Sequence, residues 1–150
     1  MFRFLEPGPL VDGDLELVLV ERRSGSLWRK RVPAYKFEMR LNGTRQRVGQ
    51  IDLRVGDLPH LRLYGGQIGY GVDEPHRGHR YAARAVRLLL PLARSHGMRT
   101  LWITCDPENA ASRRTCELAG ARFVEIVDLP RGIDMYREGQ RRKCRYRIDL

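Results

Sequence analysis

Long hydrophobic runs are missing from this sequence of 150 residues. No stretch approaches the roughly 20 apolar residues that a membrane-spanning helix needs, and the opening MFRFLEPGPL does not read as a secretory leader. Cysteine is also scarce: Cys105, Cys116 and Cys144 are odd in number and lack C-x-x-C spacing, which argues against a disulfide framework or a zinc site. We therefore expect a cytoplasmic protein with reduced thiols, no metal and no membrane partner.

Lysine is nearly absent, although positive charge is abundant. It occurs only at positions 30, 36 and 143, so 25 of the 28 basic residues (28 − 3) are arginine, and the formal net charge is +10. Such a charge can attract nucleic acid, acidic proteins or a phosphorylated cofactor. Because the arginines are dispersed along the chain, we favour a solvated basic surface and do not expect nucleic acid as the partner.

The apolar pattern predicts one domain, residues 1–150, without repeats or a low-complexity linker. Short alternating or continuous apolar runs predict strands, and apolar residues at helical spacing predict helices. The expected strands are 14–21, 35–41, 46–55, 65–72, 100–105, 122–129 and 143–149, the expected helices are 81–96 and 109–117, and the expected loops are 24–34, 56–64 and 130–140. Hairpins followed by this β-α-β-α-β-β order predict an α/β (α+β) fold with helices on the faces of a mixed sheet.

Single residues mark several boundaries between these elements. Asn42 and Gly43 predict a hairpin turn. Gly97 is placed to end the first helix and Asn109 to cap the second. Pro91 lies inside the first helix and should kink it, since proline has no N–H to donate.

The most informative stretch runs from Gly65 to Ala82, GGQIGYGVDEPHRGHRYA. An apolar strand ends near Val72, and a short turn then leads directly into a helix. The first N–H groups of a helix have no partner within it and lie at the positive end of its dipole. Arg77 and Arg80 add charge there, so we expect this turn to bind a phosphate or pyrophosphate.

This stretch, followed by a buried strand and by Asn109-Ala-Ala-Ser112 at a helix start, resembles the GNAT superfamily of acetyl-CoA-dependent N-acyltransferases. The resemblance covers residues 65–123. The superfamily signature is Arg or Gln, two residues, Gly, one residue, then Gly or Ala. Arg77 fills its first position and Ala82 its last, whereas Arg80 replaces the central glycine and Gly78 compensates in part. A generic β-α-β unit with a capped helix would carry part of the same pattern.

The resemblance implies a GNAT-like, mostly antiparallel central sheet of about six to seven strands flanked by helices, with the N-terminal helical segment shortened. It also implies acetyl-CoA as cosubstrate, with pantetheine between two strands that splay apart and pyrophosphate on the backbone that follows. The residues expected to bind this cosubstrate are Tyr70, Gly71, Val72, Arg77, Gly78, His79, Arg80, Tyr81, Ala82, Asn109 and Ser112.

The function that follows is transfer of an acetyl group from acetyl-CoA to a primary amine of an unidentified small molecule or protein. Two alternatives stay open: a GNAT-like protein that binds acyl-CoA without transferring the acyl group, and a basic module associated with nucleic acid. The first is motivated by Arg80, by the short acceptor region, and by Cys116 where many relatives carry a tyrosine. The arginine-rich last strand also suggests pairing across a homodimer, an expectation at the level of the family.

The catalytic groups are not assigned from the sequence. Glu38, Asp52 and His60 are candidate bases, although each residue type is more often a surface charge. Cys116 could serve as an acid or could simply fill the core. His79, with His76 three residues before it, is interpreted as a phosphate neighbour or a surface histidine, because the motif offers no third metal ligand.

Overall fold

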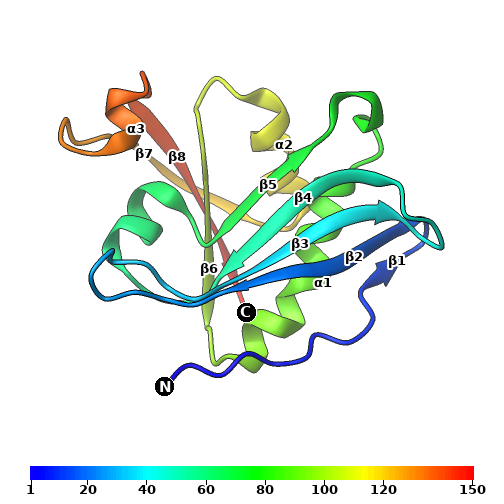
Figure 1. Cartoon of the computed structure of the whole chain (residues 1–150). Helices are drawn as coiled ribbons and strands as arrows, with labels where there is room; N and C mark the ends of the chain where they lie inside the picture. Colours follow the sequence, from blue (N-terminus) through cyan, green and yellow to red (C-terminus); the bar gives the residue numbers. More distant parts are fainter.

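Two antiparallel sheets form the frame of the protein in the computed structural model, which describes residues 1–150 (Figure 1). The first sheet has five strands in sequence order: β1 (Val11–Asp12), β2 (Leu15–Arg23), β3 (Ala34–Leu41), β4 (Arg47–Arg54) and β5 (Ile68–Val72). The second has the order β6-β8-β7, with β6 at Thr100–Cys105, β7 at Arg122–Asp128 and β8 at Arg142–Asp149. The predicted α+β fold is confirmed, but the single expected sheet is divided in two.

Two longer helices complete the fold, α1 (Tyr81–Ser95) and α2 (Ala110–Leu118). Helix α1 continues through Pro91, which leaves the carbonyl of Arg87 without its helical donor. Gly97 follows the helix at φ +77°, as expected of a residue that ends a helix. The side chain of Asn109 accepts a hydrogen bond from the N–H of Ser112 at 3.0 Å, so the predicted cap of α2 is confirmed.

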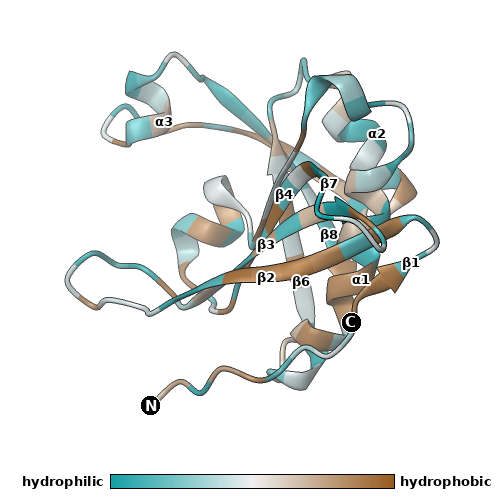
Figure 2. Cartoon of the chain, turned by 45° about the vertical axis from the view of Figure 1, so that its right-hand side comes forward, coloured by the Kyte–Doolittle hydropathy of each residue, from teal (hydrophilic) through white to brown (hydrophobic).

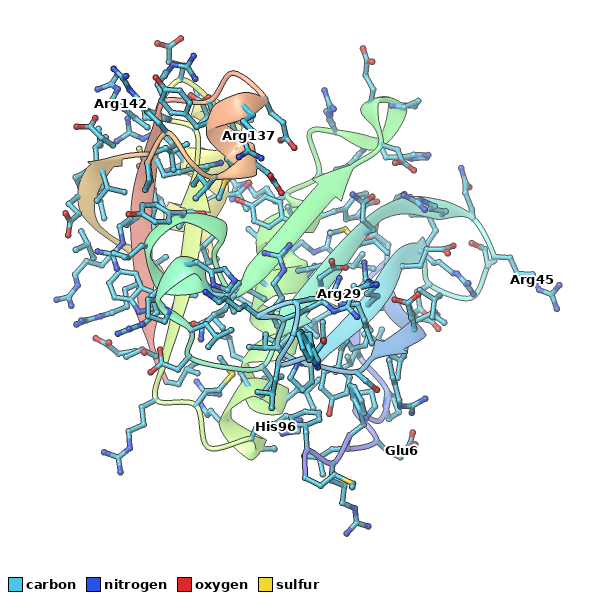
Figure 3. The ribbon with its side chains drawn as sticks, turned by 60° about the vertical axis from the view of Figure 1, so that its left-hand side comes forward. Glu6, Arg29, Arg45, His96, Arg137 and Arg142 are labelled. Carbon is cyan, nitrogen blue, oxygen red and sulfur yellow. The ribbon has the colours of Figure 1, made fainter.

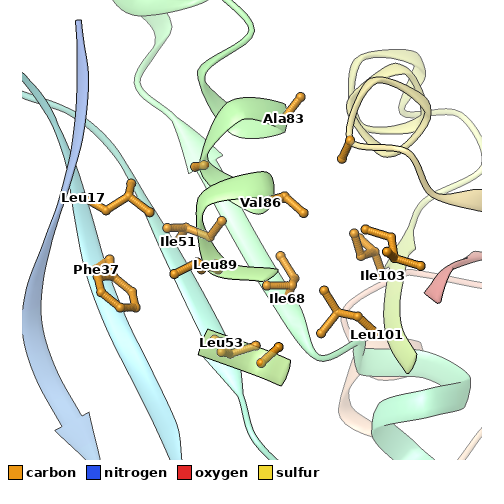
Figure 4. Packing of buried hydrophobic residues seen from close by; sticks show 14 of the residues in the cluster. Leu17, Phe37, Ile51, Leu53, Ile68, Ala83, Val86, Leu89, Leu101 and Ile103 are labelled. Atoms are coloured by element: carbon orange, nitrogen blue, oxygen red, sulfur yellow. The ribbon is translucent and has the colours of Figure 1, made fainter. Parts of the chain in front are cut away.

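The hydrophobic core lies where α1 packs against both sheets. Val86 and Leu89 of α1 are fully buried, and Figure 4 shows them beside Ile51 of β4 and Leu101 of β6. Figure 2 colours the chain by hydropathy: β2 and α1 are largely hydrophobic, whereas α2 and α3 are mostly hydrophilic. One helix therefore holds the two sheets together through shared apolar contacts.

Short helical turns occupy two segments that the sequence analysis expected to be loops. The turn η1 (Leu61–Gly65) overlaps the expected loop 56–64 at residues 61–64, and α3 (Asp134–Arg137) falls within 130–140, so these two predictions were wrong in part. A third short turn, η2 (Glu74–His76), precedes α1. Each has five residues or fewer, which is too short for an apolar period to be visible in the sequence.

The last strand, β8, is hydrogen-bonded on both sides, to β6 and to β7. It therefore has no free edge, and the expectation that this strand pairs across a homodimer is wrong. The exposed edge of the second sheet is β7, on which Phe123, Val124 and Ile126 are solvent-exposed. No helix of the structure has the length and apolar character to cross a bilayer.

The two sheets meet at Gln67, which directly precedes β5 and is 3% exposed. Its backbone N–H donates to the carbonyl of Trp102 on β6 at 2.7 Å, and its side-chain oxygen accepts from the N–H of Trp102 at 2.8 Å. Its side-chain nitrogen donates to the carbonyl of Gly56 at 2.6 Å, and its carbonyl accepts from Arg54 of β4 at 2.8 Å. Beyond this point β5 and β6 form no ladder, and they diverge toward α2 (Figure 1).

Replacing Gln67 by alanine is expected to lower the free energy of unfolding by about 3 kcal/mol, because two buried backbone groups lose their partners. Chemical denaturation of the Gln67→Ala variant measures this loss. The control is Gln46→Ala, at an exposed position in the β3–β4 turn, which should cost less than about 0.5 kcal/mol. Equal stability of the two variants would show that Gln67 does not hold the sheets together.

Candidate functional site

A cleft of about 670 Å³ opens where β5 and β6 have separated. Its walls are the end of β5, the turn before α1, the start of α1, and one side of α2. The structure brings ten of the eleven predicted cosubstrate residues to this cleft: Tyr70, Gly71, Val72, Arg77, Gly78, Arg80, Tyr81, Ala82, Asn109 and Ser112. Two segments that lie far apart in the sequence therefore line one cavity.

His79 is the one predicted residue that does not line the cleft. Its ring lies against Tyr81, with centroids 5.2 Å apart, and its carbonyl accepts a hydrogen bond from Arg84. His76 does line the cleft. No group of three potential metal ligands occurs anywhere in the structure.

The backbone N–H groups at the start of α1 are unpaired. The N–H of Arg77 donates to the carbonyl of Glu74 at a long 3.3 Å, but the N–H groups of residues 78–82 have no hydrogen-bond acceptor within the protein. Five consecutive free donors at the positive end of a helix, beside a cleft, are the arrangement that binds anions at helix N-termini in general. The sequence motif predicted this arrangement.

The charged side chains that line the cleft also favour an anion. Three arginines line it, Arg77 and Arg80 on one side and Arg114 on the other, and no carboxylate does. The Arg77 side chain donates from Nε to the carbonyl of Val72 at 3.1 Å, which fixes it at the end of β5. Asp73, the nearest acidic residue in the turn, is engaged by Arg47 at 3.4 Å. A phosphate in this cleft would meet only positive charge.

Arg80 adopts the left-handed backbone conformation, with φ +60° and ψ +26°. Non-glycine residues pay roughly 1–2 kcal/mol for this conformation because the Cβ crowds the following carbonyl. This is the position at which the family signature has glycine, and the geometry explains why. Gly78 is also left-handed, with φ +98°, and a Cβ there would meet no atom within 4 Å. The close approach to the backbone that the motif requires is therefore retained at Gly78.

The Tyr70 side chain is a feature of the site that the sequence analysis missed. Its hydroxyl crosses the cleft to α2, where it lies 2.7 Å from Oγ of Ser112 and 3.8 Å from Sγ of Cys116. Burial raises the pKa of Tyr70 above its ordinary value, so the hydroxyl stays protonated. The hydroxyl thus reaches α2 next to Cys116, the position at which the sequence analysis expected a tyrosine from the family pattern. Only the pairing of distant elements reveals it.

Cys116 is fully buried beneath Tyr70. A hydrogen bond with Cys105 raises the pKa of Cys116 and lowers that of Cys105, and burial adds to the first effect. A thiol that stays neutral and is enclosed by protein contributes to core packing. The third cysteine, Cys144, is the cross-strand neighbour of Cys105 and is also buried.

The candidate bases lie away from this cleft. Phe37, Met39 and Ile51 face the core, so alternation along β3 and β4 turns Glu38 and Asp52 to the opposite face. Glu38 is paired with Arg40 at 3.1 Å, and Asp52 with Lys36 at 3.5 Å. His60 is exposed, immediately before η1. The structure does not bring the three together.

The family of the chain follows from comparison with known proteins. Residues 3–122 match the family model described as an acetyltransferase (GNAT) domain, and the chain therefore belongs to this family of acetyltransferases. The resemblance stated from the Arg77–Ala82 and Asn109–Ser112 motifs is confirmed. A search of curated proteins found no match.

Solved structures share the fold. A GNAT-family acetyltransferase from Bacillus anthracis is 22% identical, with a TM-score of 0.59, over 76% of this chain and 65% of its own length. An acetyltransferase from Salmonella typhimurium, described as modifying the N-terminal serine of ribosomal protein L7/L12, is 17% identical, with a TM-score of 0.59, over 78% of this chain and 64% of its own. This chain thus spans less than two thirds of either.

A ribosomal L7/L12 alpha-N-protein acetyltransferase, solved in complex with coenzyme A, matches over more of its length. It is 14% identical, with a TM-score of 0.67, over 95% of this chain and 98% of its own. At these identities the likeness is one of fold.

Arg80→Gly is expected to raise the free energy of unfolding by about 1 kcal/mol, because glycine adopts the left-handed conformation without the Cβ penalty. Arg80→Ala is the matched control: it removes the same charge but keeps the strain, so it should give no gain. Thermal and denaturant unfolding of both variants tests the difference. A glycine variant that is no more stable than the alanine variant would contradict the assigned strain.

Proposed function

We propose that this protein transfers an acetyl group from acetyl-CoA to a primary amine. The observation that carries the proposal is the row of five unpaired N–H groups, residues 78–82, at a basic cleft that lies between the end of β5 and α2. A diphosphate fits the row of donors, and an extended arm fits the gap between β5 and β6. Membership of the acetyltransferase (GNAT) domain family supports the same cosubstrate.

The pantetheine arm would add to the free edge of β5. Strand β5 pairs with β4 on one side only, so alternate backbone groups between Ile68 and Val72 face the gap without partners. An extended chain bearing amides can satisfy such an edge as an additional strand would. Asn109 and Ser112 form the opposite wall. This placement brings the thioester close to Tyr70 and Gly71.

The chemistry needs few protein groups. The amine attacks the thioester carbonyl, a C–N bond forms, and the C–S bond then breaks. The backbone N–H of Tyr70, which the β4–β5 register turns away from β4, would stabilise the developing oxyanion, an effect worth about 3–4 kcal/mol for one well-placed donor. The amine releases its proton to water or a base, and the leaving thiolate takes a proton. The Tyr70 hydroxyl, held by Ser112 at 2.7 Å, is the group on the cleft wall that can supply it.

The acceptors of two structural relatives support an amine. The Salmonella typhimurium enzyme is described as modifying an N-terminal serine, and the coenzyme A complex belongs to an alpha-N-protein acetyltransferase. The alternative of a protein that binds acyl-CoA without transfer is motivated by Arg80 and Cys116, which depart from the family pattern. The alternative of a nucleic-acid module rests on the net charge of +10 alone.

Calorimetric titration with acetyl-CoA, followed by an assay of thiol release against a panel of amines and N-terminal peptides, separates these functions. Micromolar binding with release of free thiol is the expected result. Binding without release from any acceptor would favour the non-catalytic protein. Absence of acetyl-CoA binding together with salt-sensitive RNA binding would favour the nucleic-acid module.

Gly78→Glu should weaken acetyl-CoA binding about tenfold more than Gly78→Gln. Both side chains impose the same backbone strain at φ +98°, so the difference isolates the repulsion between a carboxylate and the pyrophosphate. Calorimetry on both folded variants measures it. Equal affinities in the two variants would place the pyrophosphate elsewhere.

Tyr70→Phe should lower kcat about 100-fold while leaving the KM for acetyl-CoA nearly unchanged, because loss of a general acid acts on the chemical step. Steady-state thiol release gives both constants. Ser112→Ala serves as the comparison, since it removes the 2.7 Å contact with the serine Oγ but keeps the Tyr70 hydroxyl and its bond to the carbonyl of residue 112. Unchanged kcat in the phenylalanine variant would remove Tyr70 from the chemistry.

A further inference from the structure

The face of the five-stranded sheet opposite α1 is polar and open at β5. Alternation along β3 and β4 turns a set of charged or polar side chains to this face: Lys36, Glu38, Arg40, Gln50, Asp52 and Arg54. Strand β5 contributes glycine at the corresponding positions. A Cβ at Gly69 would lie 2.7 Å from Nη2 of Arg54, and one at Gly71 would lie 2.7 Å from Nε2 of Gln50. The two glycines thus let polar side chains lie directly on the strand that would hold the acetyl group.

Arg54 is held in place but has donors to spare. Its Nη1 donates to the carbonyls of Gly65 and Gly66, both at 3.0 Å, which fixes the guanidinium across the start of β5. Its Nε and Nη2 have no hydrogen-bond partner in the protein, and it forms no ion pair. A guanidinium has five N–H bonds in a rigid fork that matches a carboxylate or phosphate. The free side of this fork lies over Gly69.

A second arginine increases the excess of positive charge. Arg23 and Arg54 are both register neighbours of Ala34, which is fully buried beneath them. Nε of Arg23 is buried and has no hydrogen-bond partner, and the same holds for Arg31 in the turn that follows β2. Burial lowers the pKa of Arg54 below its ordinary value; the charge of Asp52 opposes this shift, and the charge of Arg23 adds to it. The unpartnered buried donor of Arg23 and the free donors of Arg54 indicate an anion that would complete this pair.

The nearest carboxylate does not fill this role. Asp52 lies on the same face of β4, but its carboxylate is paired with Lys36 at 3.5 Å. Glu38, further along, is paired with Arg40. The arginine cluster, defined as Arg23 and Arg54, therefore faces a single nearby carboxylate, Asp52, which it shares with Lys36.

The position of Arg54 over β5 sets the distance between the arginine cluster and the acceptor nitrogen. Arg54 lies on Gly69, and the thioester is placed at Tyr70 and Gly71, one to two residues along β5. Two residues of strand span about 6.6 Å. An amine that attacks from the open face would thus have the arginine cluster about 7 Å to one side.

We propose that the arginine cluster is the recognition site for an anionic group on the acceptor, so that the substrate is an amine carrying a carboxylate or phosphate about 7 Å from its nitrogen. An N-terminal amine followed by an acidic or phosphorylated residue has this spacing. The proposal rests on the proposed function for the location of the acetyl group. It extends that function by naming the class of acceptor.

The turn after β2 favours a peptide over a small amine. Leu27 and Trp28, which follow Arg23 by a few residues, are each 98% exposed. Two large apolar side chains side by side in the sequence, without intramolecular contacts, offer a surface for an acceptor that extends beyond its reactive residue. The exposure of Trp28 shows that its side chain does not pack the turn down onto the sheet.

The test uses three tripeptide amides that differ at the second residue, Ala-Glu-Ala, Ala-phosphoSer-Ala and Ala-Gln-Ala. Each is titrated calorimetrically into the full-length protein saturated with coenzyme A, and each is then assayed for thiol release with acetyl-CoA. Acidic or phosphorylated peptide should bind about tenfold more tightly than the glutamine peptide, the equivalent of one charge-assisted hydrogen bond. The tighter of the two anionic peptides identifies the group.

Arg54→Met and Arg23→Met should each reduce this preference to about threefold or less. The second variant leaves the Gly65 and Gly66 carbonyls paired and so keeps the test valid if the first does not fold. Arg45→Gln is the control for net charge: Arg45 points into solvent from the β3–β4 turn (Figure 3), and its loss should leave the preference intact.

The two proposals fail in different ways. Equal binding of the charged and neutral peptides, no binding of either, or an equal effect of Arg45→Gln overturns the inference, whether or not thiol is released. Selective binding of an anionic peptide that Arg54→Met abolishes, without thiol release, supports the arginine cluster and contradicts the transferase.

Discussion

The hydrogen bonds of Gln67 are the constraint on which the rest of the site depends. One buried amide and its backbone join β4, β6 and the loop before η1, and no further ladder bond links the two sheets. If the bonds continued, β5 and β6 would pair along their length, and the backbone of β5 would have no free edge. Because they stop at one residue, the strands separate, and α2 lies across the opening. The cleft, the unpaired strand edge and the reach of Tyr70 to Ser112 all follow from this single junction.

Much of the fold could be predicted because most of its elements are determined by patterns of neighbouring residues. Strands β2 to β8 and both long helices fall close to the expected ranges, since alternation and helical periodicity act over neighbouring residues. The cap at Asn109 and the helix end at Gly97 are equally local. The division into two sheets is not, because it depends on Gln67 meeting Trp102, 35 residues away. The turns η1 and α3 were missed because a single turn leaves no period to detect.

The residues of the candidate site also fall into two groups, those that could be assigned from the sequence and those that could not. The turn before α1 is a property of one contiguous motif, so residues 77–82 could be chosen from the sequence, and all of them except His79 line one cleft. Their role in binding acetyl-CoA stays a prediction. Tyr70 and Arg54 could not have been assigned side-chain roles, because each acquires its surroundings from strand register and from a helix or turn far along the chain.

The three cysteines stack behind the cleft where β6, β8 and α2 meet, and none is more than 5% exposed. A maleimide or an aromatic disulfide reagent can reach them only when the helix and the sheets part. When the coenzyme A released by the enzyme is measured with an aromatic disulfide, the cysteines of the native protein therefore add almost nothing to the absorbance. The slow cysteine labelling that does occur reports how often this region opens by local unfolding. A ligand that binds in the cleft should slow this labelling further.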